Sequence, residues 1–223
     1  MDRTDDGAPA RRRPGRPRKA EAGDTKEELT RAALRLFSRH SFEGTSIRAI
    51  AREVGLSESV LYAHFENKQA IFDAVIARYG PQDSARTLDG VDHELANTDP
   101  PQFLTQLVGA FLDDWDREEA RTLISLVSRD GLLQSEPLRA ALSGTTDYAT
   151  RLFSDWLAEG WIPEHLGPGD RLAYSFTGPI GLARVLHLHA DAGPAERSQA
   201  RADVLRHVDL FAAAVFRDHG KRP

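Results

Sequence analysis

The sequence contains no cysteine among its 223 residues. This absence excludes disulfide bonds and thiolate chemistry, and it agrees with a reducing cytoplasm. No apolar run approaches the roughly 18 residues that a membrane span needs. The arginine-rich N-terminus is not followed by the apolar stretch of a secretory signal. We therefore expect a cytoplasmic protein without a membrane partner.

The sequence also lacks the motifs of catalysis. It has no glycine-rich phosphate loop and no recognisable pairing of a nucleophile with a base. His187 and His189 stand two residues apart, which would place their rings on different sides of a helix and disfavours a metal site. We expect neither an enzyme nor a bound cofactor or metal.

The net charge of −5 is unevenly distributed along the chain. Residues 1–80 carry 15 basic and 12 acidic residues, a net charge of +3, whereas residues 81–223 carry 14 and 22, a net charge of −8. A basic segment joined to an acidic body is typical of a nucleic-acid-binding domain joined to a second domain. The same distribution also fits a basic tail on an otherwise ordinary protein, so charge alone leaves both interpretations open.

Apolar residues recur at helical spacing through most of the chain, and no stretch alternates like a strand. The sequence therefore predicts an all-α protein with about nine helices. Thr25 and Glu28 have the spacing of a capping box, which predicts the start of the first helix at this point. Residues 1–23, which are rich in proline, glycine and arginine, are expected to form a disordered arm.

Gly80 and Pro81 mark the predicted boundary between two domains. The first, at residues 24–80, is a helical DNA-binding domain, and the second, at residues 81–223, is a larger helical bundle for regulation and dimerisation. Residues 82–100 are polar and are expected to form a loop.

Two short helices are predicted between Ser46 and Phe65. Thr45 or Ser46 can cap the first helix, and Ser57 can cap the second, which we expect to extend to Phe65. Gly55 ends the first helix because the turn there needs a positive φ. Two helices joined in this way form a helix-turn-helix, whose second helix is presented to the major groove of DNA.

A further helix is predicted directly after this motif. Asn67 can cap it. Its apolar residues recur at helical spacing and are expected to be buried: Ile71, Phe72, Val75, Ile76 and Tyr79.

The sequence around the motif resembles a known family. Residues 45–72, and above all the pattern Leu61-Tyr62-x-His64-Phe65-x-Asn67-Lys68, are similar to the DNA-binding domain of the TetR/AcrR family of bacterial transcription regulators. The resemblance covers residues 24–80. It implies a small helical DNA-binding domain, a larger helical regulatory domain and a homodimer.

The resemblance also implies which residues contact operator DNA. Positions that contact phosphates in the family correspond to Tyr62, His64 and Lys68. Positions that face the groove correspond to Arg48, Glu58 and Ser59, although the Glu58 carboxylate has an alternative role as a favourable charge at a helix N-terminus. The predicted DNA-contacting residues of this domain are Thr45, Ser46, Arg48, Ser57, Glu58, Ser59, Tyr62, His64 and Lys68.

Three residues depart from the family pattern, the first of them Ser59, where many relatives carry glycine. Many relatives carry threonine at the position of Val60, which lacks a hydroxyl group, and Ala63 is smaller than the usual arginine, tyrosine or tryptophan. These departures do not affect the expected fold. They mean that the operator sequence cannot be transferred from a relative.

The basic arm contains a second candidate for DNA contact. Gly15-Arg16-Pro17 resembles the core of an AT-hook, in which an extended arginine lies along a narrow A·T minor groove. The match is partial because Pro14 stands where an arginine is usual. Arg16 and Arg18 are therefore predicted to contact DNA, either in the minor groove or as part of a non-specific basic tail that attracts phosphates.

The C-terminal region is rich in aromatic residues for its number of helices. Packing in the core explains any one of them, but the resemblance adds that such a domain often encloses a ligand cavity. We expect a small, largely apolar effector. The candidate effector-binding residues are Phe103, Leu107, Phe111, Trp115, Tyr148, Phe153, Trp156 and Phe176.

The last predicted helix, at residues 200–217, carries apolar residues around much of its circumference. The helix before it, at residues 172–189, contains the small residues Gly178 and Gly181, which permit close approach of a second helix or a kink. A helix that is apolar on so many sides buries some of its residues against its own core and others against a partner, so these last two helices are predicted to form a dimer interface. The sequence as a whole predicts a homodimeric transcriptional regulator, in the family usually a repressor that an effector releases from its operator. The alternative is an architectural DNA-binding protein that uses the basic arm and senses no ligand.

Overall fold

The computed structural model describes residues 19–80 and 90–217. Within these ranges the chain is helical and has no strand, which confirms the predicted fold class. Arg16, Arg18 and the remainder of the basic arm up to residue 18 lie outside the described residues. The α-helices are α1 (Lys19–Gly44), α2 (Ile47–Glu53), α3 (Glu58–Tyr62), α4 (Lys68–Tyr79), α6 (Leu95–Thr98), α7 (Pro100–Trp115), α8 (Glu118–Arg129), α9 (Glu136–Ala158), α10 (Gly169–His187) and α11 (Pro194–Val215), with single 3-10 turns at Leu132–Gln134 and Glu164–Leu166.

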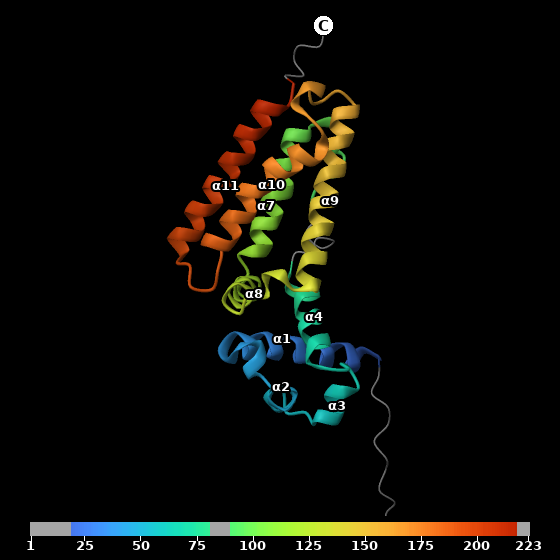
Figure 1. Ribbon diagram of the computed structural model, residues 1–223, viewed down its shortest axis with the longest axis vertical. Helices are drawn as coiled ribbons and strands as arrows, with labels where there is room; N and C mark the ends of the chain where they lie inside the picture. The colour runs from blue at the N-terminus through green and yellow to red at the C-terminus, as the bar shows by residue number, and fades with distance from the viewer. Residues whose placement is uncertain (1–18, 81–89, 218–223) are drawn as a thin grey trace, which may run out of the picture.

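The helices form two parts along the long axis of the molecule (Figure 1). Helices α1–α4 lie at one end, with α2 and α3 outermost, and α7, α9, α10 and α11 form a bundle at the other. Helix α8 lies at the junction and packs on both α1 and α4. The core around α1–α4 accordingly takes in apolar residues from the other part of the chain, namely Leu123, Leu126, Val127 and Leu138. The division at residue 80 stays a prediction.

The caps of α2 and α4 confirm the sequence prediction. The Ser46 hydroxyl accepts a hydrogen bond from the Ala49 N–H, and the Asn67 side chain accepts one from the Ala70 N–H. Gly55 takes φ 71°, the left-handed conformation that glycine adopts with little strain. The five apolar residues predicted for the buried side of α4 are buried.

Several predicted helix boundaries differ from the structure. Helix α1 begins at Lys19 and not at Thr25, because residues 19–22 (Lys-Ala-Glu-Ala) are themselves good helix formers. Helix α3 ends at Tyr62 and not at Phe65, since the Ala63 N–H turns to the Val60 carbonyl. The expected loop at 82–100 contains α6, and α11 begins at Pro194, six residues before the predicted start.

Helix α1 is interrupted at Ser41, which has φ 66° and ψ 164°. A regular helix would join the Phe42 N–H to the Ser38 carbonyl. Here the Phe42 N–H instead donates to Asp130 Oδ2 at 2.8 Å, and Arg129 Nη1 donates to the Ser38 carbonyl. The interruption of α1 breaks the hydrogen bond between the Phe42 N–H and the Ser38 carbonyl. Arg129 and Asp130, which we call the α8 clamp, provide each of these two groups with a new partner.

The α8 clamp is held together by an ion pair. Arg129 Nε lies 2.7 Å from Asp130 Oδ1, and Arg129 Nη2 donates to the Phe37 carbonyl at 3.0 Å. Burial disfavours ionisation of Asp130, but the hydrogen bonds from Arg129 and the Phe42 N–H and the charge of Arg129 outweigh it. Together they lower the pKa of the carboxyl below its ordinary value of 3.8. At neutral pH the clamp is a charged contact between α8 and the end of α1.

Candidate nucleic-acid interface and cavity

The outer surface of α2 and α3 gathers most of the side chains predicted to contact DNA. Ser46, Ser57, Glu58 and Ser59 are exposed, and so is the side chain of Arg48. Tyr62 is 51% exposed and His64 is partly exposed. We call these seven residues the reading face.

Tyr62 and His64 have polar groups that remain available on this face. Neither the Tyr62 hydroxyl nor the His64 ring makes a hydrogen bond within the described residues. The ring of Tyr62 lies on the surface, whereas its neighbour Leu61 is fully buried and anchors α3 to the core. The two polar side chains can therefore meet an external acceptor such as a phosphate without breaking an internal bond.

Arg48 and Glu58 are paired across the turn of the motif. Arg48 Nε lies 3.6 Å from Glu58 Oε1, and both side chains remain substantially exposed. A surface ion pair of this kind contributes little to stability. It does place opposite charges side by side on the reading face, so Glu58 would meet DNA with an arginine beside it.

The prediction for Thr45 is wrong, because its side chain is only 3% exposed. Its hydroxyl lies 2.8 Å from the Ser41 carbonyl and 3.2 Å from the Leu36 carbonyl. The hydroxyl therefore provides a hydrogen-bond partner for backbone carbonyls near the end of α1, and it does so from inside the fold. A buried hydroxyl that donates to backbone in this way is not available to DNA.

Lys68 also differs from its expected role as a phosphate contact. Its ammonium donates to the Phe42 carbonyl at 2.9 Å and lies 4.5 Å from the centre of the Phe42 ring. Glu43 Oε2 lies 3.7 Å from the same nitrogen. The side chain of Lys68 thus fastens the start of α4 to the end of α1. Its contact with a phosphate stays a prediction.

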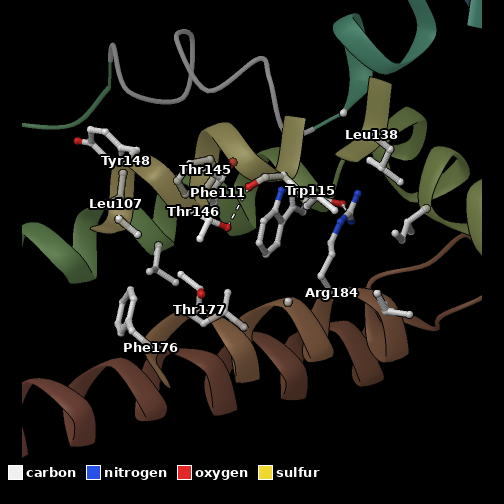
Figure 2. Close-up of a pocket in the computed structure, with 18 of the residues that line it drawn as sticks. Leu107, Phe111, Trp115, Leu138, Thr145, Thr146, Tyr148, Phe176, Thr177 and Arg184 are labelled. Atoms are coloured by element: carbon white, nitrogen blue, oxygen red, sulfur yellow. Dashed lines mark hydrogen bonds between the residues drawn. The ribbon is translucent and has the colours of Figure 1, made fainter. Parts of the chain in front are cut away.

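A cavity of about 370 Å³ lies between α7, α8, α9 and α10 (Figure 2). This volume falls in the range of small-molecule sites. Most of its walls are apolar. Six of the eight predicted effector-binding residues line it: Leu107, Phe111, Trp115, Tyr148, Phe153 and Phe176.

Phe103 and Trp156 do not line the cavity, so the prediction is wrong for these two residues. Both are buried in the neighbouring core, where their rings meet edge to face at 6.2 Å between centroids. The Trp156 indole N–H donates to the Ala96 carbonyl at 2.7 Å and so ties α9 to α6. These two aromatic residues pack in the core, which is the first of the two roles that the sequence allowed.

The cavity has polar walls that the sequence analysis missed. Thr145, Thr146, Thr177 and Arg184 all line it. Arg184 could have been noticed, because it follows Phe176 and Ile180 at four-residue spacing on the buried side of α10. A charged residue on an apolar helical stripe indicates a buried cation.

The end of α4 also reaches the cavity. Tyr79, the last residue of α4, and Gly80 are among the lining residues. The Gly80 N–H donates to the Ile76 carbonyl at 2.8 Å, and a Cβ built on Gly80 would lie only 2.4 Å from that oxygen. The backbone is therefore closely packed where α4 meets the cavity.

Known proteins resemble the chain in both sequence and structure. The sequence family described as "Bacterial regulatory proteins, tetR family" matches residues 29–75, which contain the reading face. Residues 29–75 are therefore a DNA-binding domain of the TetR type. TetR-family proteins are regulators of transcription and not enzymes, as the sequence predicts.

Two curated relatives come from Bacillus subtilis. The HTH-type transcriptional regulator LmrA is 32% identical over 127 residues, which cover 53% of this chain and 63% of LmrA. The uncharacterized HTH-type regulator YerO is 24% identical over 134 residues, covering 60% of this chain and 46% of YerO. The chain thus spans between about half and two thirds of these relatives.

The TetR fold extends over nearly the whole described chain. The structure of SmeT, the repressor of the Stenotrophomonas maltophilia multidrug efflux pump SmeDEF, superposes with a TM-score of 0.65 at 19% identity. The superposition covers 91% of this chain and 96% of SmeT. Within residues 19–80 and 90–217, every helix is too short or too polar to span a bilayer.

Proposed function

We propose that this chain binds operator DNA through the reading face and releases it when a small, largely apolar effector fills the cavity. The observation that carries the proposal is the position of α4. One end of this helix, at Lys68, is fastened to α1 beside the reading face, and the other end, at Tyr79, lines the cavity. An effector that favours a different placement of Tyr79 would therefore favour a different placement of the DNA-binding end.

Repression is the simplest form of this regulation. A regulator that binds its operator without ligand blocks transcription until the effector arrives. SmeT, which shares the fold, carries the name of a repressor. The cytoplasm, where operator DNA lies, is the expected location of such a protein.

Selection of genomic DNA fragments on the full chain tests the proposal. We expect it to recover a short set of related sites, each an inverted repeat with half-sites about one helical turn or more apart. Fragments without a shared motif, bound only at low salt, would contradict the proposal, because they would indicate binding through phosphates alone.

We further propose that the chain acts as a homodimer through α10 and α11. These helices lie side by side on one flank of the molecule (Figure 1). On α10, Tyr174, Leu182 and Leu186 recur at multiples of four residues and are 75%, 60% and 51% exposed, and on α11 Leu210 is 66% exposed. A surface this apolar on one side of a monomer is typical of an interface with another chain.

Replacing Leu182 with glutamate should convert the dimer into a monomer at micromolar concentration, because the carboxylate would be buried against apolar side chains. Light scattering measures the molar mass of the variant. The affinity of the variant for DNA with two half-sites should fall together with this mass. Ser143→Glu, an equally charged change at an exposed position of α9, is the control and should leave the mass unchanged. A dimer that persists in Leu182→Glu would show that the interface lies elsewhere.

A further inference from the structure

Arg184 is the only charged residue among the described residues that line the cavity. It lies on one side of the cavity, next to Trp115, whereas Leu107, Tyr148 and Phe176 lie on the other (Figure 2). Its guanidinium carbon is 5.3 Å from the centre of the Trp115 ring. The cavity is therefore apolar on one side and positively charged on the other.

Among the residues that the structure describes, no carboxylate forms a hydrogen bond with the Arg184 guanidinium. Its partners are three backbone carbonyls: Nη1 donates to Trp115 and Leu188 at 2.9 and 3.0 Å, and Nη2 donates to Ala120 at 2.7 Å. These bonds engage three of the five N–H groups of arginine and leave Nε–H and one Nη2–H. The carbonyls carry no net charge, so they fix the position of the cation without neutralising it.

The charge of Arg184 is also poorly solvated. Burial lowers the pKa of the guanidinium to about 10, although Asp114 and Asp116 nearby act in the opposite direction. Arg184 is therefore still protonated at neutral pH. A buried cation is stabilised by an anion that reaches its remaining N–H groups.

The threonine hydroxyls on the cavity wall favour ligand groups that donate a hydrogen bond, whereas Arg184 favours groups that accept one. Thr145, Thr146 and Thr177 each donate their proton to the carbonyl four residues earlier, at 3.3, 3.0 and 2.7 Å. Their oxygens can then only accept a hydrogen bond from a ligand. A carboxylate has no proton to donate, so it cannot form a hydrogen bond with these threonine oxygens.

We infer that the effector is an amphipathic anion, which places a carboxylate or similar group at Arg184 and an apolar body along the wall formed by Leu107, Tyr148 and Phe176. This inference rests on the proposed function only in taking the cavity as the effector site. It narrows the expected effector from any apolar molecule to one with a single negative charge at one end.

Binding of matched probes to the full chain, measured by calorimetry without DNA, tests the inference. Decanoate is compared with decanol, and 2-naphthoate with 2-naphthol, so that each pair shares an apolar body and differs in charge. At neutral pH, at least one carboxylate should bind about tenfold or more tightly than its alcohol, the usual strength of a hydrogen bond to a charged group. No carboxylate preference in either pair, or no binding by any probe, would overturn the inference.

Arg184→Met tests whether Arg184 causes the preference. This change should remove the preference for the carboxylate while leaving the affinity for the alcohol within about twofold. Arg121→Met is the control, because Arg121 lies near Arg184 and carries the same charge but does not line the cavity. It should keep the preference of the original chain. If Arg184→Met retains the preference, the inference is wrong.

Arg184 also joins the ends of α7, α8 and α10, so Arg184→Met could fail to fold. Arg184→Lys then replaces it, since lysine keeps the charge but cannot form the side-on pair. We expect a reduced but persistent carboxylate preference, and an unchanged one would overturn the inference. Because these readouts involve no DNA, a carboxylate that binds through Arg184 without releasing DNA would contradict the proposed function and leave the inference standing.

Discussion

Replacing Tyr62 with phenylalanine and His64 with alanine together should weaken operator binding by about 100-fold. Each substitution removes a polar group that we expect to meet a phosphate, and a hydrogen bond to a charged group contributes about 1.5–3 kcal/mol. The thermal stability should change little, because neither side chain makes a hydrogen bond within the described residues. Fluorescence anisotropy with a labelled operator measures the affinity, and a thermal melt monitors the fold.

Ser143→Ala is the control. It removes an exposed hydroxyl group from α9, which lies in the other part of the molecule and outside the proposed interface between subunits. Its operator affinity should equal that of the unchanged chain. If the Tyr62 and His64 variant binds normally while Arg16→Ala with Arg18→Ala abolishes binding, the architectural alternative based on the basic arm is correct.

Replacing Asp130 with alanine should lower the free energy of unfolding by about 2–4 kcal/mol. The change leaves the Phe42 N–H without its acceptor and Arg129 without its partner, and an unsatisfied group of this kind costs about 1–3 kcal/mol. Chemical denaturation measures the loss. Asp113→Ala, which removes an exposed carboxylate paired with Arg201, is the control and should cost less than about 1 kcal/mol.

The pH dependence gives the clamp a second signature. The folded-state pKa of Asp130 is depressed, so its contribution to stability is fully present above its ordinary pKa of 3.8 and disappears as the pH falls through the lower, folded value. Asp130→Asn should therefore lose less stability than the unchanged chain over this acidic range. If the free energy of unfolding falls equally with pH in the two proteins, the charge of Asp130 does not stabilise the clamp.

The clamp also bears on regulation. Arg184 binds the Trp115 and Ala120 carbonyls at the junction of α7 and α8, and the α8 clamp holds α1 at the other end of the same helix. Helix α8 thus connects the wall of the cavity to the DNA-binding end, in parallel with α4. A weakened clamp should reduce the effect of an effector on DNA affinity as well as the stability.

Local patterns in the sequence were sufficient to predict the helix-turn-helix. Ser46, Gly55 and Asn67 act through contacts within three or four residues, and each has the predicted role in the structure. The wall of the cavity was predicted in part, because aromatic residues at helical spacing line either a core or a cavity. Only the three-dimensional packing separates Phe111, which lines the cavity, from Phe103, which lies in the core.

The residues that the sequence misplaced depend on distant contacts. Thr45 is buried because the break at Ser41 brings the Leu36 and Ser41 carbonyls to its hydroxyl. Lys68 turns inward because its ammonium contacts the ring and the carbonyl of Phe42. Phe42 lies 26 residues earlier in the sequence, so no local pattern indicates this contact. The α8 clamp joins residues about 90 positions apart, so no periodicity in either helix could have predicted it.

The most direct test of the account is the affinity of the full chain for a selected operator and for a scrambled sequence of equal length, at physiological salt, with and without a cavity-binding carboxylate. We predict that the operator binds at least about 1,000-fold more tightly than the scrambled DNA. The carboxylate should weaken operator binding by about fivefold or more. Equal affinity for the two DNA sequences, or operator binding that does not change when the cavity is filled, would contradict the account.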